Sequence, residues 1–431
     1  MGVSAFHPGS GGLPAPSGMR RARLLPQFDT HNGWANILPS PAPARQQEGA
    51  HATDWLVIGA GFTGLSAARS LAGHFAADRI TLIDADRVGN GASGRNAGFA
   101  IDVPFLQEAH GNLARGKRIL ALHRAGQAEL DRLVSEHGID CQWSRRGKYM
   151  VAVGERAQDI LRRTQSFLEA LGADSTVLCA DALEDRLGTG FYRMGLYSPG
   201  TYLMNPAALT RGLAASLPEN VVVFENSPVL ELQLAPDVVA RTEKGRIRAK
   251  RIILATDGFI ESFGILRHRI FNIMTCASIT EPLSTSGEAD RLGGTPDWGV
   301  HPAGAAGATI RRTQDNRIWH RVGFAYSSTM RVSDDALRRF RVRHIKDFMA
   351  RFPQLGTPRF EHTYAGNLCM SRNSEPIFQR LSDNVFIVGC QNGIGVSKGT
   401  IHGKLIADWA AGASSELLEH ARAYGAPCKI P

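Results

Sequence analysis

The feature that most constrains the fold of this 431-residue chain is a glycine-rich stretch within DWLVIGAGFTGLSAARSLAG, which begins at Asp54. The consecutive apolar residues at its start predict a strand that is buried on both faces, as in a parallel sheet. Gly59, Gly61 and Gly64 then match G-x-G-x-x-G. These glycines permit a tight turn, a close approach of the backbone to a pyrophosphate, and close packing of the next helix on the strand. The helix predicted over 63–75 would direct its free N–H groups at the phosphates.

A second predicted strand strengthens this interpretation. The segment RITLIDA (79–85) ends near Asp84, about twenty residues after Gly64. An acidic residue at this place accepts hydrogen bonds from a ribose hydroxyl. Strand, glycine turn, helix, strand and acid together predict an α/β protein with a Rossmann-like dinucleotide-binding domain.

The segment RVGNGASGRNAGFAID (87–102) distinguishes between the two common dinucleotide cofactors, NAD and FAD. It places Ser93, Arg95 and Asn96 among small residues directly after the acidic strand. A simple nicotinamide site has no use for such a loop. Its backbone amides and Arg95 suit the pyrophosphate of a longer cofactor. This segment therefore favours FAD over NAD.

With GASGRNAG following an acid-ended strand, the chain resembles the D-amino-acid-oxidase-like flavoproteins, which include sarcosine, glycine, pipecolate and gamma-glutamylputrescine oxidases. The resemblance runs from about residue 50 to residue 413. It implies an FAD-binding Rossmann-like domain interleaved with a mixed-sheet α+β substrate domain. The implied segments are a partly flexible leader (1–49), the FAD domain (50–110, 205–262 and 362–415), the substrate domain (111–204 and 263–361) and a tail (416–431).

The resemblance also implies which residues bind FAD. Most belong to the two glycine turns and to the loop after Asp84; the late turn, QNGIGVSKG, would place a helix N-terminus beside the flavin ring, where it stabilises negative charge. The implied residues are Gly59, Ala60, Gly61, Phe62, Thr63, Gly64, Asp84, Ala85, Ala92, Ser93, Arg95, Asn96, Ala97, Gly98, Val229, Ala255, Thr256, Cys369, Gly393, Ile394, Gly395 and Val396.

Cys369 raises the question of how the flavin is held. It falls where sarcosine oxidases carry a cysteine joined covalently to the flavin, whereas gamma-glutamylputrescine oxidase has an apolar residue there. A buried structural cysteine is the commoner case. We therefore expect non-covalent FAD, with a covalent link through Cys369 as the alternative.

The reaction implied by the resemblance is hydride transfer from a C–H beside an amine nitrogen to flavin N5, followed by hydrolysis of the imine. A flavin carries this chemistry, while the protein supplies position and electrostatics. No metal site and no serine-type triad are expected. The candidate catalytic residues are Lys398, His320, Arg321 and Tyr364, with Tyr202 as a further candidate.

Two departures from the family pattern leave the substrate and the electron acceptor open. The chain has Tyr364–Ala365–Gly366 where relatives often have Trp-x-Gly, and Ile394 where they often have histidine. We expect a small-molecule amine or amino acid as substrate, and oxygen, a quinone or a partner protein as acceptor. The alternative is a flavin-binding subunit of a hetero-oligomeric amine or opine dehydrogenase.

Composition limits the other classes of function. The net charge of +9 comes from basic residues that are spread along the chain and not interleaved with aromatics, so we expect no nucleic-acid partner and a mild preference for acidic substrates. Six scattered cysteines without a CxxC pair indicate a reducing compartment, hence the cytoplasm. No apolar run approaches the roughly 20 residues that span a bilayer, and the N-terminus lacks the apolar core of a signal peptide.

Overall fold

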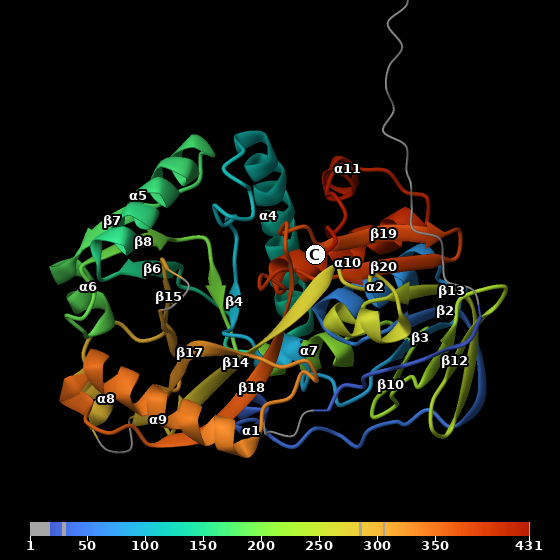
Figure 1. Cartoon of the computed structure of the whole chain (residues 1–431), viewed down its shortest axis with the longest axis horizontal. Coiled ribbons are helices and arrows are strands. Elements are labelled where there is room, and N and C mark those ends of the chain that lie inside the picture. The colour runs from blue at the N-terminus through green and yellow to red at the C-terminus, as the bar shows by residue number, and fades with distance from the viewer. Residues whose placement is uncertain (1–17, 28–31, 284–286, 305–306, 431) are drawn as a thin grey trace, which may run out of the picture.

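The computed structural model describes residues 18–27, 32–283, 287–304 and 307–430. Within these residues the strands form a nine-stranded sheet, an eight-stranded sheet and a small three-stranded sheet. Figure 1 shows the two large sheets on opposite sides of the molecule. The predicted α/β fold class with a second, mixed sheet is confirmed.

The nine-stranded sheet has a parallel centre. β2 (Gly49–Ile58) pairs parallel with β3 (Ile80–Ile83) and with β13 (Gly245–Leu254). β10 (Val221–Phe224) extends the sheet beside β3, and the end of β13 pairs with β20 (Val385–Gly389). The glycine turn and Asp84 therefore follow neighbouring parallel strands and meet at the same edge. The antiparallel strands are β1 (Arg20–Arg21), β11 (Glu231–Gln233), β12 (Val238–Arg241) and β19 (Ile377–Ser382).

Three helices cover one face of this parallel centre. α2 (Phe62–His74) and α4 (Leu113–His137) both pack against α10 (Ser397–Ala410). Their apolar sides and the centre of the sheet share one buried core. α7 (Pro206–Ala215) begins as the sequence predicts, with Asn205 as its cap. In the parts of the chain that the structure describes, no helix combines the length and the apolarity needed to cross a membrane.

The eight-stranded sheet carries its own helices. α9 (Asp334–Arg351) packs on β14, β17 and β18, and α5 (Glu155–Ala170) packs on β6 and β8. In spatial order its strands are β18 (Phe360–Ser371), β14 (Ile270–Thr280), β17 (Ile318–Tyr326), β16 (Thr309–Arg312), β15 (Trp298–Pro302), β6 (Lys148–Ala152), β8 (Met194–Ser198) and β7 (Thr176–Cys179).

The remaining elements are short. In the three-stranded sheet, the central strand β9 pairs with β4 on one side and with β5 on the other. The elements are α1 (Gly33–Asn36), α3 (Ala92–Arg95), α6 (Ala180–Leu187), α8 (Glu288–Leu292), α11 (Glu416–Arg422), the 3₁₀ helices η1 (Asp257–Phe263) and η3 (Pro353–Leu355), β4 (Phe99–Ala100), β9 (Tyr202–Leu203) and β5 (Ser144–Arg145).

The described part of the predicted leader packs onto the body. Arg20 and Arg21 pair with β11, so this stretch is an edge strand instead of a loose tail. Trp34 is fully buried and stacks on Trp319 at 6.2 Å between ring centroids. Residues 1–17 and 28–31 of the leader lie outside the described residues. The domain boundaries remain predictions; β18, part of which we assigned to the FAD domain, pairs in the eight-stranded sheet.

Candidate active site

A cavity of about 650 Å³ is lined by the ends of β2 and β3, by the turn that follows β13, and by residues of β14, β17 and β18. It brings together 20 of the 22 residues expected at FAD. These are Gly59, Ala60, Gly61, Phe62, Thr63, Asp84, Ala85, Ala92, Ser93, Arg95, Asn96, Ala97, Val229, Ala255, Thr256, Cys369, Gly393, Ile394, Gly395 and Val396.

The other two residues, Gly64 and Gly98, lie behind the wall. A Cβ at Gly64 would lie 1.7 Å from the Gly59 carbonyl oxygen, and a Cβ at Gly98 would lie 2.2 Å from the Met204 carbonyl oxygen. Both glycines therefore let backbone segments pack closely and do not face the cavity themselves.

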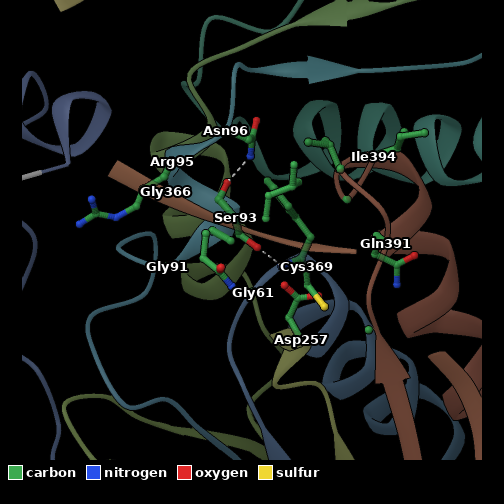
Figure 2. A pocket seen from close by; sticks show the side chains of 18 of the residues that line it. Gly61, Gly91, Ser93, Arg95, Asn96, Asp257, Gly366, Cys369, Gln391 and Ile394 are labelled. Atoms are coloured by element: carbon green, nitrogen blue, oxygen red, sulfur yellow. Dashed lines mark hydrogen bonds between the residues drawn. The ribbon is translucent and has the colours of Figure 1, made fainter. Parts of the chain in front are cut away.

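The first glycine turn forms one end of the cavity. Gly61 caps α2 without a side-chain hydrogen bond, so N–H groups of the first turn stay available to an anion. Ser93 closes over this turn: the Phe62 N–H donates to Ser93 Oγ at 3.0 Å, and a Cβ on Gly61 would lie only 2.6 Å from the same oxygen. Figure 2 shows Gly61 and Ser93 side by side in the wall. A side chain at position 61 would therefore displace the Ser93 hydroxyl from this turn.

Asp84 follows β3 and faces the same end. Its carboxylate accepts a hydrogen bond from the Ala60 N–H at 2.6 Å and another from the Asp86 N–H at 3.1 Å. Burial raises the pKa of Asp84 to about 6, although these two hydrogen bonds oppose the rise. A buried carboxylate at the cavity wall is suited to accept hydrogen bonds from ribose hydroxyls.

Arg95 lines the cavity, but its guanidinium donates hydrogen bonds to backbone carbonyl groups of the protein. Nε donates to the Asn90 carbonyl at 2.5 Å, and Nη1 donates to the Ala365 carbonyl at 2.8 Å. Figure 2 shows the side chain directed away from Ser93 and Cys369. In this way Arg95 ties the loop after β3 to β18, and its contact with the pyrophosphate stays a prediction. The loop folds back against that strand and so brings these carbonyl groups within hydrogen-bond distance of the guanidinium, which has five donors.

Several polar atoms of the wall have no partner among the described residues. Thr256 Oγ1, Asn367 Oδ1, Arg321 Nε and both amide atoms of Gln391 are buried without a hydrogen bond. Buried polar groups are normally satisfied, so these atoms point to a bound polar molecule. Together with the glycine turn and Asp84, they fit an extended dinucleotide.

The second glycine turn approaches the cavity from β20 and leads into α10. Gly393 has a φ of +84°, a conformation that suits glycine. Ile394 and Val396 line the cavity, as does Cys369 from β18. A hydrogen bond with Cys390 and burial raise the pKa of the Cys369 thiol well above its ordinary value. This part of the wall therefore combines apolar side chains with the polar Asn367 and Gln391.

Another part of the cavity wall holds a cation and aromatic rings. Arg321 on β17 donates to Thr309 Oγ1 at 2.6 Å, and no carboxylate of the described residues lies within ion-pair distance of it. Burial lowers the pKa of Arg321 to about 10. His301, Phe105 and Phe324 line the wall around it. A half-buried cation without a carboxylate partner suits an anionic group on a ligand.

A model of the FAD dependent oxidoreductase family, DAO, matches residues 54–409. The chain belongs to this family. Probable oxidoreductase OrdL of Haemophilus influenzae is 27% identical over 380 residues, which cover 84% of each chain. Gamma-glutamylputrescine oxidoreductase of Escherichia coli is 26% identical over 368 residues, which cover 83% of this chain and 84% of the relative. Glycine oxidase from Geobacillus kaustophilus has the same fold, with a TM-score of 0.67 at 18% identity, over 85% of this chain and 96% of the other.

Membership of this family settles the class of cofactor and of protein. The chain is an FAD-dependent oxidoreductase, and its relatives include gamma-glutamylputrescine oxidoreductase. The glycine turn, Asp84 and the unpartnered wall atoms are the residues that would hold FAD.

Three of the four candidate catalytic residues do not reach the flavin cavity. His320 is fully buried behind the sheet, where Nε2 lies 2.7 Å from Asp347 Oδ2. The Tyr364 hydroxyl accepts a hydrogen bond from Trp319 Nε1 at 2.7 Å. Strand alternation turns the His320 side chain to the face away from the cavity, whereas Arg321 faces it. Tyr364 lies in register with Arg321 across β14 and shares its face, but its side chain is buried against Trp319 and is not part of the wall. Tyr202, the further candidate, stacks on Trp143 and is also absent from the wall.

Lys398 is the third residue that lies outside the wall. Its Nζ lies 2.6 Å from Glu108 Oε1, and the side chain is fully buried. It belongs to the first turn of α10, on the side that packs against α4.

Sequence reasoning missed several wall residues. His301 stands on β15 and Phe105 in the connection after β4, and Leu24, Leu25 and Pro26 of the leader also line the cavity. Each lies in a segment without a motif. A single histidine or phenylalanine in such a segment carries no signal, so only the fold could reveal it.

Proposed function

We propose that the protein oxidises the C–N bond of an amine or N-substituted amino acid that bears an anionic group. FAD, when bound, supplies the two-electron acceptor, whose N5 takes the hydride from the C–H beside the nitrogen. The nitrogen lone pair forms the C=N bond as the hydride leaves, and water then hydrolyses the imine to a carbonyl compound and an amine. The substrate must therefore enter this step with a neutral nitrogen.

The position of Arg321 is the observation that supports an anionic substrate. It is the catalytic candidate from the sequence that lines the cavity, and it lacks a carboxylate partner among the described residues. Its Nε is free of any hydrogen bond, while Nη2 is held by Thr309 Oγ1. A guanidinium oriented in this way binds a carboxylate with strong, directional hydrogen bonds. The substrate would be anchored by its acid group with the amine nearer the flavin.

The surrounding side chains suit this chemistry. Phe105, Met150 and Phe324 line the same part of the cavity wall, and Trp319 lines it on β17. Apolar walls exclude water from the reacting bond and strengthen the interaction of Arg321 with an anion. They also favour a substrate with an apolar body.

The same site supports a second assignment, in which the chain is the flavin-binding subunit of a hetero-oligomeric amine or opine dehydrogenase. Ile394 favours it, because this apolar residue lines the cavity where relatives often have histidine. Electrons would then pass to a quinone or a partner protein and not to oxygen.

The six cysteines are all unpaired in the structure, in keeping with the cytoplasmic location that we propose.

Anaerobic bleaching of the flavin band by a panel of amines and amino acids tests the proposal. We expect N-substituted amino acids with apolar bodies to bleach it, and the corresponding methyl esters to bleach it far more slowly. Admission of air then separates the two assignments, since an oxidase recolours at once and a dehydrogenase does not. A correctly loaded flavin that no amine bleaches would overturn the assignment as a stand-alone enzyme.

A further inference from the structure

Lys148 is a cation that the proposed chemistry does not yet use. It stands at the start of β6 with 3% of its surface exposed, and no carboxylate of the described residues lies within ion-pair distance. Its Nζ lies 3.3 Å from His301 Nε2 and 4.9 Å from the centre of the Phe105 ring. Lysine is almost never fully buried without a charged partner, so this placement calls for a reason.

His301 and Phe105 separate Lys148 from the cavity. Both line the cavity wall, and their rings meet edge to face at 5.4 Å between centroids. Lys148 itself is not part of the wall. Its ammonium group therefore lies one side chain behind the part of the cavity wall where Arg321 would anchor a substrate.

The charged groups around Lys148 and His301 come from two other elements. Arg321 belongs to β17, and Asp102 lies in the connection after β4. Asp102 accepts a hydrogen bond from Thr201 Oγ1 at 2.9 Å and lies beyond ion-pair distance of Lys148.

Burial and the neighbouring charges determine the protonation states of Lys148 and His301 at neutral pH. Burial lowers the pKa of Lys148 to about 8, while the charge of Asp102 opposes this. Burial, the Lys148 charge and the more distant Arg321 hold the pKa of His301 well below its usual value, against a hydrogen bond with the Pro302 backbone. At pH 7 the imidazole is therefore neutral and the lysine is mainly charged.

We infer that Lys148, acting through His301, is a positioning residue that keeps the nitrogen of the substrate in its neutral, hydride-donating form. This inference rests on the proposed amine oxidation. An ammonium group on a substrate whose acid group is held by Arg321 would face the Lys148 charge across the His301 ring and the Arg321 charge on the same wall. The proton is lost to solvent as the substrate binds, because like charges disfavour the protonated form.

The expected effect is large enough to measure. For two unit charges ~7 Å apart, at an effective dielectric constant of ~20, the repulsion lowers the pKa of the bound amine by roughly 1 to 2. The substrate would then be bound as the free amine at a pH where it is protonated in water.

The test is the pH dependence of flavin reduction in the FAD-loaded protein. The limiting rate constant is measured anaerobically between pH 6 and 10 with the best substrate of the panel, because it reports groups in the complex. For Lys148→Met we expect the midpoint of the profile to move up by about one to two pH units. Lys148→Arg keeps the charge and should keep the midpoint. Lys404→Met removes an exposed lysine of α10 and serves as the matched control.

The outcomes separate the two proposals. A midpoint that is the same in wild type and Lys148→Met, with both proteins reduced by the substrate, overturns the role of Lys148 alone. Failure of every amine to reduce the wild-type flavin overturns the proposed function and this inference with it.

Binding of unreactive ligands gives a readout that does not depend on turnover. 2-Aminoisobutyrate has an amine but no hydrogen on its α-carbon, and isobutyrate lacks the amine. In the wild type we expect the affinity for 2-aminoisobutyrate, followed by the flavin spectrum, to rise from pH 6 to 9, while that for isobutyrate does not rise. If Lys148→Met does not fold, this measurement decides alone, and an affinity for 2-aminoisobutyrate that fails to rise overturns the inference.

Discussion

Lys398 Nζ lies 2.6 Å from Glu108 Oε1 in the interior of the protein, where the lysine is fully buried and the glutamate is 4% exposed. His123 Nε2 approaches the same oxygen at 3.5 Å. Burial alone would raise the pKa of Glu108, but Lys398 and His123 hold it well below its usual range. The ion pair joins α10 to the connection that carries Phe105, and thus fixes one wall of the cavity.

Lys398→Met should therefore destabilise the protein while leaving the chemistry in place. Removal of one partner leaves Glu108 buried and charged, and we expect the free energy of unfolding to fall by about 3 to 5 kcal/mol in urea denaturation. The double variant Lys398→Met/Glu108→Leu should recover most of this loss and should still be reduced by substrate. A double variant that folds and binds FAD but is not reduced would restore Lys398 as a substrate contact.

The pair formed by Lys404 and Asp408 on the same helix is the matched control for this experiment, because Asp408 is buried but keeps His74 Nε2 at 2.7 Å when Lys404 is replaced. Its Nζ–Oδ2 distance is 2.8 Å, but the Lys404 side chain is 42% exposed. Exposed ion pairs contribute ~0 to 1 kcal/mol. Lys404→Met should thus shift the free energy of unfolding by less than about 1 kcal/mol.

Lys398 also shows how far sequence reasoning reaches at this site. The motif QNGIGVSKG predicted the turn and the helix, since glycines and a following apolar periodicity are local signals. The direction of the lysine depends on Glu108, which lies 290 positions earlier in the chain. No local pattern encodes that partner. The same reason explains His301 and Lys148, which are joined only by the pairing of β15 with β6.

The cofactor end was predictable because its signals are local. Gly59, Gly61 and Asp84 stand at fixed distances from strands that the apolar runs mark. Arg95 was predicted to lie at this end and does, but its hydrogen bonds go to carbonyl groups. Sequence can place a residue in a loop, whereas the choice among several acceptors depends on how the loop folds against β18.

Gly61→Val should abolish retention of FAD. A Cβ at this position would lie 2.6 Å from Ser93 Oγ, and the branched side chain would fill the space beside the first turn of α2. We expect the variant to purify without flavin colour, measured as the ratio of absorbance at 450 and 280 nm. Gly73→Val on the same helix is the control, because a Cβ there meets nothing within 4 Å. A yellow Gly61→Val protein would contradict the assignment of the turn.

Asp84 makes FAD affinity depend on pH. Burial raises the pKa of this carboxyl to about 6. Only the ionised form accepts hydrogen bonds from both ribose hydroxyls, so affinity should be highest above pH 6 and should fall as the pH drops through that value. Asp84→Ala should weaken FAD binding by roughly ten-fold or more at pH 8 and should flatten the pH dependence. Titration of the apoprotein with FAD between pH 5 and 8 gives both quantities, and identical curves for the two proteins would exclude the ribose contact.

Arg321→Met should affect the acid group of the substrate and little else. Loss of charged hydrogen bonds worth about 1.5 to 3 kcal/mol predicts a rise of about 10- to 100-fold in the substrate dissociation constant. The measurement is the dependence of the anaerobic reduction rate on substrate concentration. For the methyl ester of the same substrate, wild type and variant should differ by less than about three-fold. Equal loss for acid and ester would show that Arg321 supports the fold of β17 instead of binding the carboxylate.

The raised pKa of the Cys369 thiol predicts that FAD is held without a covalent bond. The hydrogen bond with Cys390, burial and the nearby Asp257 all raise the pKa of this thiol, and attack on the flavin needs a thiolate. Precipitation of the FAD-loaded protein with trichloroacetic acid should therefore leave a colourless pellet and all of the flavin in the supernatant. Cys369→Ser should behave in the same way and should retain FAD. A yellow pellet from the wild type that becomes colourless in Cys369→Ser would establish the covalent link and would mean that FAD binding itself lowers the pKa of the thiol.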